Sequence, residues 1–314
     1  MIQIILLVIG FVVLMKGATF FVDGASSIAR NFKLSKMLVG LTIVAFGTSA
    51  PEFAVSIQSM LSESGEIVLG NVIGSNILNI LLILGISSII HSLNVKNTTV
   101  KKEIPIVLLL TSVLIVLMSD QALGGRNNIL TRGDGLVIIL FFLVFVYYLI
   151  SMTRKKIEDE KEEENILPLR KSISYTILGI VAIMIGSRTV VDSATELAKI
   201  LGITERLIAL TVVAVGTSLP ELVTSIVATK KGEYDISIGN VVGSNIFNIG
   251  IVLALPVLLF GNIEIGTFHV IDLIFLFLSV FLLQIFSMNG YKIKKIEGII
   301  LLITFVIYYA LVLI

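Results

Sequence analysis

Two glutamates stand in the middle of long apolar stretches, where charged side chains are rare. Glu52 lies about halfway along an apolar run at 37–59, and Glu221 about halfway along another at 205–228. A carboxylate in the hydrocarbon of a bilayer is costly, so an intramembrane glutamate is by default a functional residue. The alternative, a protonated and hydrogen-bonded structural glutamate, explains one such residue better than it explains two matched ones.

A proline precedes each glutamate, and a small polar tetrad precedes each proline. The tetrads are Gly47-Thr48-Ser49-Ala50 and Gly216-Thr217-Ser218-Leu219. Because proline has no N–H to donate to the carbonyl four residues back, each helix should break here. The residue before proline is also pushed away from helical dihedrals, which lets nearby carbonyls, including those of Thr48 and Thr217, turn toward a cavity. Proline kinks alone are common in membrane helices, but here a kink, hydroxyls and a carboxylate coincide twice.

A second polar block follows each glutamate. Residues four apart share one stripe of a helix, so Asn71, Ser75 and Asn79 should face the same way. The same holds for the matching residues Asn240, Ser244 and Asn248.

All these groups offer oxygen. The chain has no cysteine and two scattered histidines, so a thiolate or imidazole metal site is excluded. Oxygen ligands suit hard cations, and calcium accepts six to eight of them in flexible geometry. Two glutamates supply a charge of −2, which balances one divalent or two monovalent ions. Competition of such ions for one cluster is a mechanism for exchange.

The two polar regions are copies of one another. Residues 40–56 and 209–225 are identical at 10 of 17 positions, and 69–80 and 238–249 at 9 of 12. Both matches have the same offset, since 221 − 52 = 169, and no gap separates them. An internal repeat predicts two structural units. We expect a first unit at 1–153, a charged linker at 154–171 and a second unit at 172–314.

The elements that position these residues are membrane helices. Hydrophobic residues make up 56% of the chain, charged residues 14%, and the mean hydropathy is +1.05. About 20 apolar residues cross a bilayer as a helix, and the continuous runs are too long for strands of a β-barrel. The sequence predicts an all-α polytopic fold with ten transmembrane helices, near 2–22, 37–59, 67–91, 104–119, 135–152, 172–191, 205–228, 236–260, 268–287 and 297–314.

Charge in the loops predicts the orientation. The loops on one side of the membrane hold 17 of the 23 Lys and Arg residues, and those on the other side hold five. The remaining one, Lys16, lies within the first span. Positive loops stay cytoplasmic, so both termini should face outside a cell membrane.

Five helices per unit is an odd number, so the two units should have inverted topology, as in many secondary transporters. A midplane site then alternates between two faces, and we expect the helices at 2–22 and 172–191 to slide together, with Gly17 and Gly186 marking places where close packing or bending is possible.

Expected partners are small cations and the lipid bilayer. A net charge of +1 leaves no basic excess for nucleic acid, and no obligate protein partner is evident. The acidic run at 158–164 in the linker could sense calcium, but it lacks the ligand spacing and glycine turn of a folded calcium loop, so a solvated linker is the better interpretation.

The motifs Gly-Thr-Ser-x-Pro-Glu and Gly-Asn-x-x-Gly-Ser-Asn, each present twice, resemble those of the calcium/cation antiporter superfamily. The chain is most similar to its sodium/calcium exchangers, of the prokaryotic type. The resemblance implies ten helices, a central site, and calcium export driven by inward sodium, typically three sodium ions for one calcium ion.

The resemblance also implies a ligand set. The calcium site would consist of Glu52, Glu221 and the carbonyls of Thr48 and Thr217. Two sodium sites would consist of Ala45, Thr48, Ser49, Glu52 and Ser75, and of Ala214, Thr217, Ser218, Glu221 and Ser244. A middle position would lie between Asn79, Asn248 and both glutamates. Several relatives, including potassium-dependent ones, have Asp in place of Asn248, so Asn here argues against potassium co-transport.

Other functions remain as alternatives. A proton/calcium antiporter is the main one, because a buried glutamate can itself bind a proton. An ion channel fits less well, because two enclosed carboxylates would bind ions too strongly for rapid passage. We expect no enzyme and no cofactor, since the chain has no HExxH motif and Na⁺ and Ca²⁺ would be transported substrates.

Overall fold

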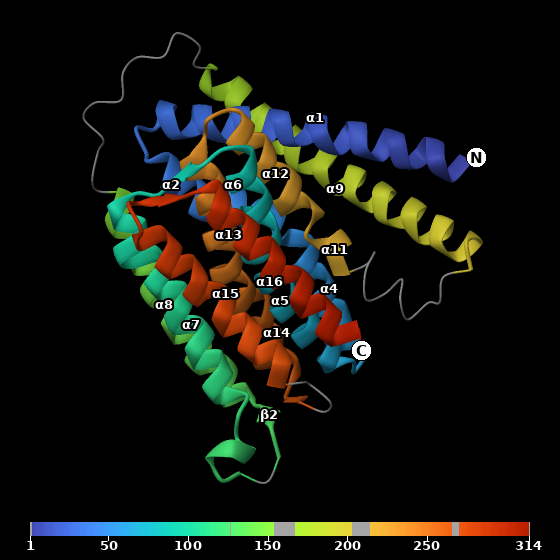
Figure 1. Cartoon of the computed structure of the whole chain (residues 1–314), viewed down its shortest axis with the longest axis vertical. Coiled ribbons are helices and arrows are strands. Elements are labelled where there is room, and N and C mark those ends of the chain that lie inside the picture. The colour runs from blue at the N-terminus through green and yellow to red at the C-terminus, as the bar shows by residue number, and fades with distance from the viewer. Residues whose placement is uncertain (1, 126, 154–166, 203–213, 266–269, 314) are drawn as a thin grey trace.

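Helices form most of the described chain. The computed structural model describes residues 2–125, 127–153, 167–202, 214–265 and 270–313 (Figure 1). Most of the predicted linker, with its acidic run, and the start of the predicted span at 205–228 lie outside these residues. Where the described chain is not helical, it forms short turns and two-residue strands.

The elements up to residue 153 begin with one long helix and continue with broken ones. In chain order they are α1 (Ile2–Asn31), α2 (Lys36–Val39), η1 (Gly40–Val44), α3 (Ala45–Thr48), α4 (Ala50–Leu61), α5 (Gly65–Leu78), η2 (Asn79–Leu84), α6 (Gly85–Ile90), β1 (Leu93–Asn94), η3 (Thr99–Glu103), α7 (Ile104–Leu117), η4 (Gln121–Leu123), β2 (Ile129–Leu130) and α8 (Arg132–Thr153). Of the η segments, η4 is a 3₁₀ turn and the others are π-helical.

The later elements follow the same pattern. In chain order they are α9 (Leu169–Ile200), α11 (Ala214–Thr217), α12 (Leu219–Lys230), α13 (Tyr234–Phe247), η6 (Asn248–Leu253), α14 (Ala254–Phe260), β3 (Ile263–Glu264), α15 (Val270–Met288), β4 (Lys292–Ile293) and α16 (Lys295–Leu313). The π-helical segments η2 and η6 begin 169 residues apart, at Asn79 and Asn248.

Seven helices among the described residues are long and apolar enough to cross a membrane. An eighth span results if α2–α3 and α4, bent by 45° at their junction, are counted as one. The predicted span at 104–119 corresponds to α7, which has only 14 residues in its α-helical part. The chain is therefore a multi-pass helical membrane protein, and the count of ten stays a prediction.

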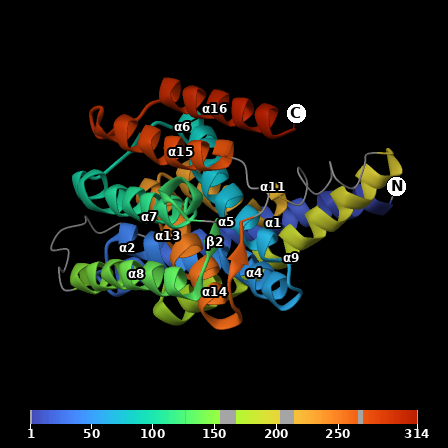
Figure 2. The same ribbon diagram turned by 90° about the horizontal axis from the view of Figure 1, so that it is seen from below.

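The most deeply buried spans are the continuous helices α5–α6 and α13–α14. In their most apolar windows 72% and 78% of residues are buried, against 22–33% in the other five spans. Figure 2 shows α15 and α16 on one side of these helices and α8 on the other. The two buried spans thus form the centre of the molecule, and the outer helices separate them from lipid.

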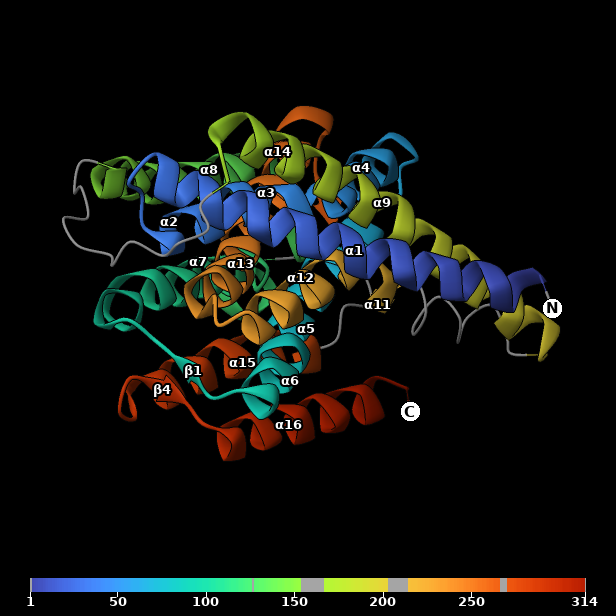
Figure 3. The same cartoon turned by 90° about the horizontal axis from the view of Figure 1, so that it is seen from above.

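Helices α1 and α9 form a separate antiparallel pair. They run side by side along one flank in Figures 1 and 3. Close contact is possible because glycines lie between them: a side chain at Gly17 would meet Ala182 and Ile183, and one at Gly186 would meet Leu14. The predicted packing role of these two glycines is confirmed.

Both helices of this pair are longer than their apolar runs. They have 30 and 32 residues, which at 1.5 Å per residue gives roughly 45–48 Å, beyond the ~30 Å of bilayer hydrocarbon. The apolar pattern at 2–22 ends just before Asp23, but the helix continues because its last turns bury polar side chains against protein.

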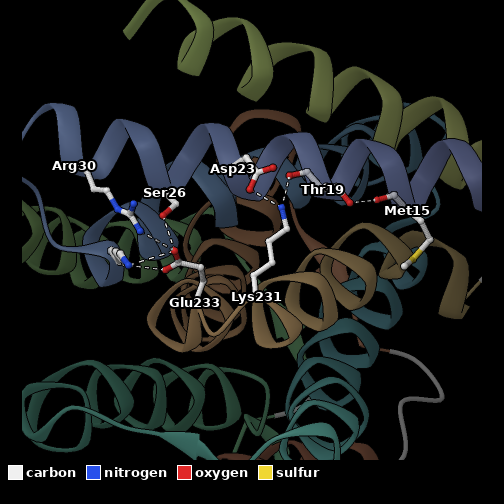
Figure 4. A network of polar contacts seen from close by, with 8 residues as sticks. Met15, Thr19, Asp23, Ser26, Arg30, Lys231 and Glu233 are labelled. Atoms are coloured by element: carbon white, nitrogen blue, oxygen red, sulfur yellow. Dashed lines mark hydrogen bonds and ion pairs between the residues drawn. The ribbon is translucent and has the colours of Figure 1, made fainter. Parts of the chain in front are cut away.

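The polar end of α1 is held to the turn between α12 and α13 (Figure 4). Lys231 reaches Asp23 at 2.5 Å, and Ser26 donates to Glu233 at 2.8 Å. Glu233 is also within 3.4 Å of Arg30 and 3.0 Å of Lys36. We call these four contacts the α1 polar network.

Two short antiparallel ladders join distant parts of the chain. Strand β1, which follows α6, pairs with β4, between α15 and α16. Strand β3, which follows α14, pairs with β2, between α7 and α8. Each ladder therefore pairs one strand from the elements before residue 153 with one strand from the later elements.

Candidate functional site

Both predicted helix breaks are present. Helix α3 ends and α4 begins around Ser49, whose dihedrals (φ −82°, ψ 4°) lie outside the helical range. Ser218 has nearly the same dihedrals (φ −90°, ψ 6°) between α11 and α12. Glu52 and Glu221 therefore lie in the first turn of a new helix, where the positive end of the helix dipole favours a carboxylate.

One carbonyl freed by a proline has found a partner that sequence reasoning missed. Ser187 of α9 donates to the carbonyl of Gly216 at 3.1 Å. The residue 169 positions before Ser187 is Ala18, which is buried and has no hydroxyl to offer. A serine within the apolar run at 172–191 was the only sequence signal, and nothing in it indicated the direction of the bond.

The two glutamates are completely buried, but their carboxylates differ in their partners. Ser49 donates to Oε1 of Glu221 at 3.1 Å, so a residue of the first repeat holds the glutamate of the second. Oε2 of Glu221 and both carboxylate oxygens of Glu52 have no hydrogen-bond partner among the described residues. On the other side of the site, Ser218 donates to Ser75 at 3.1 Å instead of to Glu52.

Asparagines in the second block hold the backbone at each glutamate. Asn71 donates to the carbonyl of Glu52 at 3.2 Å, and Asn240 donates to that of Glu221 at 3.3 Å. Asn240 also accepts a hydrogen bond from Thr48 at 3.0 Å. Asn71 and Asn240 thus hold the backbone of the two glutamates, whereas the amides of Asn79 and Asn248 bond between the two buried spans.

The remaining predicted ligands lie on the same broken helices. Thr48 Oγ1 is within 3.5 Å of Ser244 Oγ, which is a further contact between the two repeats. Ala45 and Ala214 are the first residues of the short helices α3 and α11, and Thr217 is the last residue of α11. The carbonyl of Ala45 accepts bonds from the Ser49 amide at 3.0 Å and from Thr48 Oγ1 at 3.3 Å.

Asn79 and Asn248 begin the two π-helical segments of the buried spans. Their amide nitrogens donate to Asn245 and Asn76 at 3.0 and 3.1 Å. Their Oδ1 atoms are buried and have no partner among the described residues. π-helical turns inside α-helices occur frequently at functional sites, because they change which side chains face inward. Asn76 and Asn245 belong to the repeated motif, but they do not lie on the predicted stripes.

The oxygen atoms gathered here have the chemistry of a cation-binding site. A buried polar atom normally has a hydrogen-bond partner, and an unpaired carboxylate oxygen in a low dielectric is especially unfavourable. Here several unpaired acceptor oxygens and no unpaired donor come from the two glutamates and from Asn79 and Asn248. Such a set suits a hard cation, which all these oxygens can contact at once.

Carboxylates and amides buried at the centre of a multi-pass helical membrane protein are typical of membrane transporters. The model of the family described as sodium/calcium exchanger protein matches residues 2–151 and 171–314. The chain belongs to this family. It is therefore a cation/calcium antiporter, in a family of transporters and not of enzymes.

Relatives and solved structures agree over nearly the full length. The putative antiporter CaxA of Alkalimonas amylolytica is 33% identical over 97% of this chain and 96% of its own. The sodium/calcium exchanger MaX1 of Methanosarcina acetivorans is 33% identical over 97% of both chains. A structure of the sodium-calcium exchanger NCX_Mj has a TM-score of 0.84 and 31% identity, covering 98% of each chain.

Proposed function

We propose that this protein exchanges sodium for calcium across the membrane at a central site built only of oxygen ligands. The observation that carries the proposal is the set of buried acceptor oxygens without a hydrogen-bond partner in the part of the chain that the structure describes: both oxygens of Glu52, Oε2 of Glu221, and Oδ1 of Asn79 and Asn248. Leaving these atoms unpaired in an apolar protein costs free energy unless a cation occupies the space between them.

The proposed ligands follow from this geometry and from the family. Calcium is bound by Glu52 and Glu221 with the carbonyls of Thr48 and Thr217. Sodium is bound on one side by Ala45, Thr48, Ser49, Glu52 and Ser75, and on the other by Ala214, Thr217, Ser218, Glu221 and Ser244. Asn79 and Asn248 serve the middle position. Support comes from Ser49, Thr48 and Ser75, whose hydroxyls contact the opposite repeat, so that the two motifs face one another.

Sodium is the coupling ion in this proposal. Two carboxylates carry −2, so one Ca²⁺ neutralises the pair and two Na⁺ neutralise it equally well, while a further Na⁺ needs neutral amide and hydroxyl oxygens. Asn79 and Asn248 provide such oxygens, which a proton-coupled site would not require. The similarity to MaX1 and NCX_Mj, both named as sodium/calcium exchangers, supports the same ion pair.

The proposed architecture has ten spans in two inverted repeats, with both termini outside the cell. Three observations support it. The repeat-related helices α1 and α9 are antiparallel, since Gly10 lies near Val190 and Gly24 near Thr176. The strands are exchanged reciprocally between β1–β4 and β2–β3. Hydrogen bonds from Asn71 and Asn240 to the glutamate carbonyls are related by the same 169-residue offset.

Alternating access is proposed to occur by movement of the α1–α9 pair. The glycine at the start of each tetrad faces this pair: a side chain at Gly47 would meet Phe21 and Ile180, and one at Gly216 would meet Val191. A helix surface without side chains allows a neighbour to slide past. Sliding of α1 and α9 along the two breaks would then expose the site first to one face and then to the other.

Ion flux in vesicles tests the coupling. Purified protein is reconstituted in vesicles loaded with Na⁺, diluted into Na⁺-free buffer containing ⁴⁵Ca²⁺, and held at equal pH on both sides with a protonophore present. We expect Ca²⁺ uptake that requires internal Na⁺. Uptake that ignores the Na⁺ gradient and follows an imposed pH gradient would establish the proton/calcium antiporter instead.

The same vesicles test the stoichiometry. If three Na⁺ move for each Ca²⁺, one net charge crosses the membrane per cycle, so a potassium-diffusion potential set with valinomycin should accelerate or slow the flux according to its sign. Flux that is indifferent to the potential would indicate two Na⁺ per Ca²⁺ and would leave the ligand set unchanged.

A further inference from the structure

We propose that Asn76 and Asn245 are positioning residues that determine which end of the Asn79 and Asn248 side chains faces the cation. We call this pair the asparagine clasp. The inference rests on the proposed function, and it concerns residues outside the proposed ligand set. An asparagine amide has an acceptor end and a donor end of nearly the same shape, so only its hydrogen bonds determine its orientation.

The clasp connects the two buried spans through two reciprocal hydrogen bonds to the backbone. Asn76 of α5 donates through Nδ2 to the backbone carbonyl of Asn245 at 3.3 Å. Asn245 of α13 donates through Nδ2 to the carbonyl of Asn76 at 3.2 Å. A backbone carbonyl can only accept, so the NH₂ end of each clasp residue must point at it. Both side chains are buried, so water does not offer an alternative partner.

The orientation of the clasp is passed on to the ligands. Since Nδ2 of each clasp residue is engaged, its Oδ1 points away and can only accept. Asn79 donates to Oδ1 of Asn245 at 3.0 Å, and Asn248 donates to Oδ1 of Asn76 at 3.1 Å. Both NH₂ groups are therefore held away from the site, and the Oδ1 atoms of Asn79 and Asn248 are left without a partner within the described ranges of the chain.

Without the clasp, and in the absence of a cation, the side-chain amides of Asn79 and Asn248 would be more stable with their NH₂ ends facing the site. Helix α4, which carries Glu52, packs against η6, which begins at Asn248, and α12, which carries Glu221, packs against η2, which begins at Asn79. An amide rotated by half a turn would present NH₂ to these carboxylates, and a hydrogen bond to a charged group is strong. The carboxylates would then be satisfied by protein and would bind cations weakly. The clasp prevents this internal neutralisation and keeps the middle position oxygen-only.

The first test replaces Asn245 by leucine, which has a similar size and no hydrogen bonds. We expect N245L to raise the Kd for Ca²⁺ about tenfold or more, since a favourable oxygen contact becomes an unfavourable NH₂ contact. Equilibrium binding of ⁴⁵Ca²⁺ to purified protein measures this without transport. The repeat-related N76L, which releases Asn248, should behave in the same way.

The decisive test repeats N245L in an N79D background. An aspartate has oxygen at both ends, so its orientation does not matter, and Asn245 Oδ1 would now repel it. In this background N245L should leave the Kd for Ca²⁺ unchanged or lower it. A clasp that only stabilises the fold would cost the same affinity in both backgrounds, and that result would overturn the inference. The milder N245S, compared across the same two backgrounds, gives the same discrimination if the leucine variant does not fold.

The two proposals can fail separately. If the unmodified protein binds no Ca²⁺, the proposed function fails. If it binds Ca²⁺ and the N245L and N76L variants, shown to be folded by their melting temperatures, bind it equally well, the clasp fails and the proposed function stands.

Discussion

The central helices and the α1–α9 pair are held together by different forces. In the centre, side-chain hydrogen bonds connect one repeat to the other, as from Thr48 to Asn240 and from Ser49 to Glu221. Between α1 and α9 the contacts are mainly those of glycine backbones with apolar side chains, as where Gly179 meets Phe21. Directional bonds fix the relative position of two helices, whereas smooth apolar contacts with glycine tolerate small shifts.

This difference favours rigid central helices and a mobile α1–α9 pair. Among the described residues, the polar links from the pair to the centre include the Ser187–Gly216 bond, the α1 polar network and the bond from Lys231 to the Thr19 carbonyl. These links would have to break or exchange during sliding.

The largest effect is expected from the carboxylates. Glu52→Gln and Glu221→Gln each halve the site charge while keeping the shape, and each should reduce Ca²⁺ flux in vesicles by more than about 100-fold, since charge-assisted contacts to the ion are lost. Glu103→Gln is the matched control: this buried glutamate accepts a bond from Tyr148 outside the proposed site, and its variant should retain most of the flux. Exchange by either site variant would remove the carboxylates from the mechanism.

Crosslinks test the freedom of the pair, and the chain has no native cysteine to interfere. Phe20 of α1 and Tyr175 of α9 have ring centroids 5.0 Å apart, so F20C/Y175C joined by a short bifunctional reagent should retain flux. D23C/K231C joined by the same reagent ties α1 to the centre and should lower flux at least tenfold. Equal flux in both crosslinked proteins would contradict a sliding pair.

Much of this arrangement follows from sequence because the repeat supplies each observation twice. The break before Glu52 was predictable, since proline removes a helical hydrogen bond wherever it occurs. The roles of Asn76 and Asn245 were not predictable, because the spacing of residues gives the face of a helix but not the partner across it. The full length of α1 was also missed, because its last turns are stabilised by Lys231 and Glu233, some 200 residues away in the chain.

A smaller effect is expected at Ser187. Ser187→Ala leaves the buried Gly216 carbonyl without this donor, which costs about 1–3 kcal/mol. We expect a lower melting temperature and a change in flux of a few fold. The control is Thr189→Val, which removes a hydroxyl bonded only within its own helix to the Ile185 carbonyl. If the two variants melt alike, the Ser187 bond contributes little to holding α9 on α11.

The smallest effect is expected in the α1 polar network. The Lys231 and Asp23 side chains are 30% and 41% exposed, and pairs of this kind contribute about 0–1 kcal/mol. Lys231→Met should therefore change the ratio of the inward-open to the outward-open state by at most about fivefold. This ratio is measured as the rate at which a thiol reagent labels a cysteine placed beside the network. The effect should shrink at high salt, because salt screens exposed charges. A shift that persists at 1 M salt would have to come from something other than this ion pair.

The exchanged strands have a consequence for biosynthesis. While the ribosome is still making the later helices, β1 and β2 have emerged but their partners β4 and β3 do not yet exist. The early half can be inserted into the bilayer, but its two ladders are completed only when 263–264 and then 292–293 arrive. Two fragments made separately and divided within 154–166 should therefore be degraded alone and protect one another when made together.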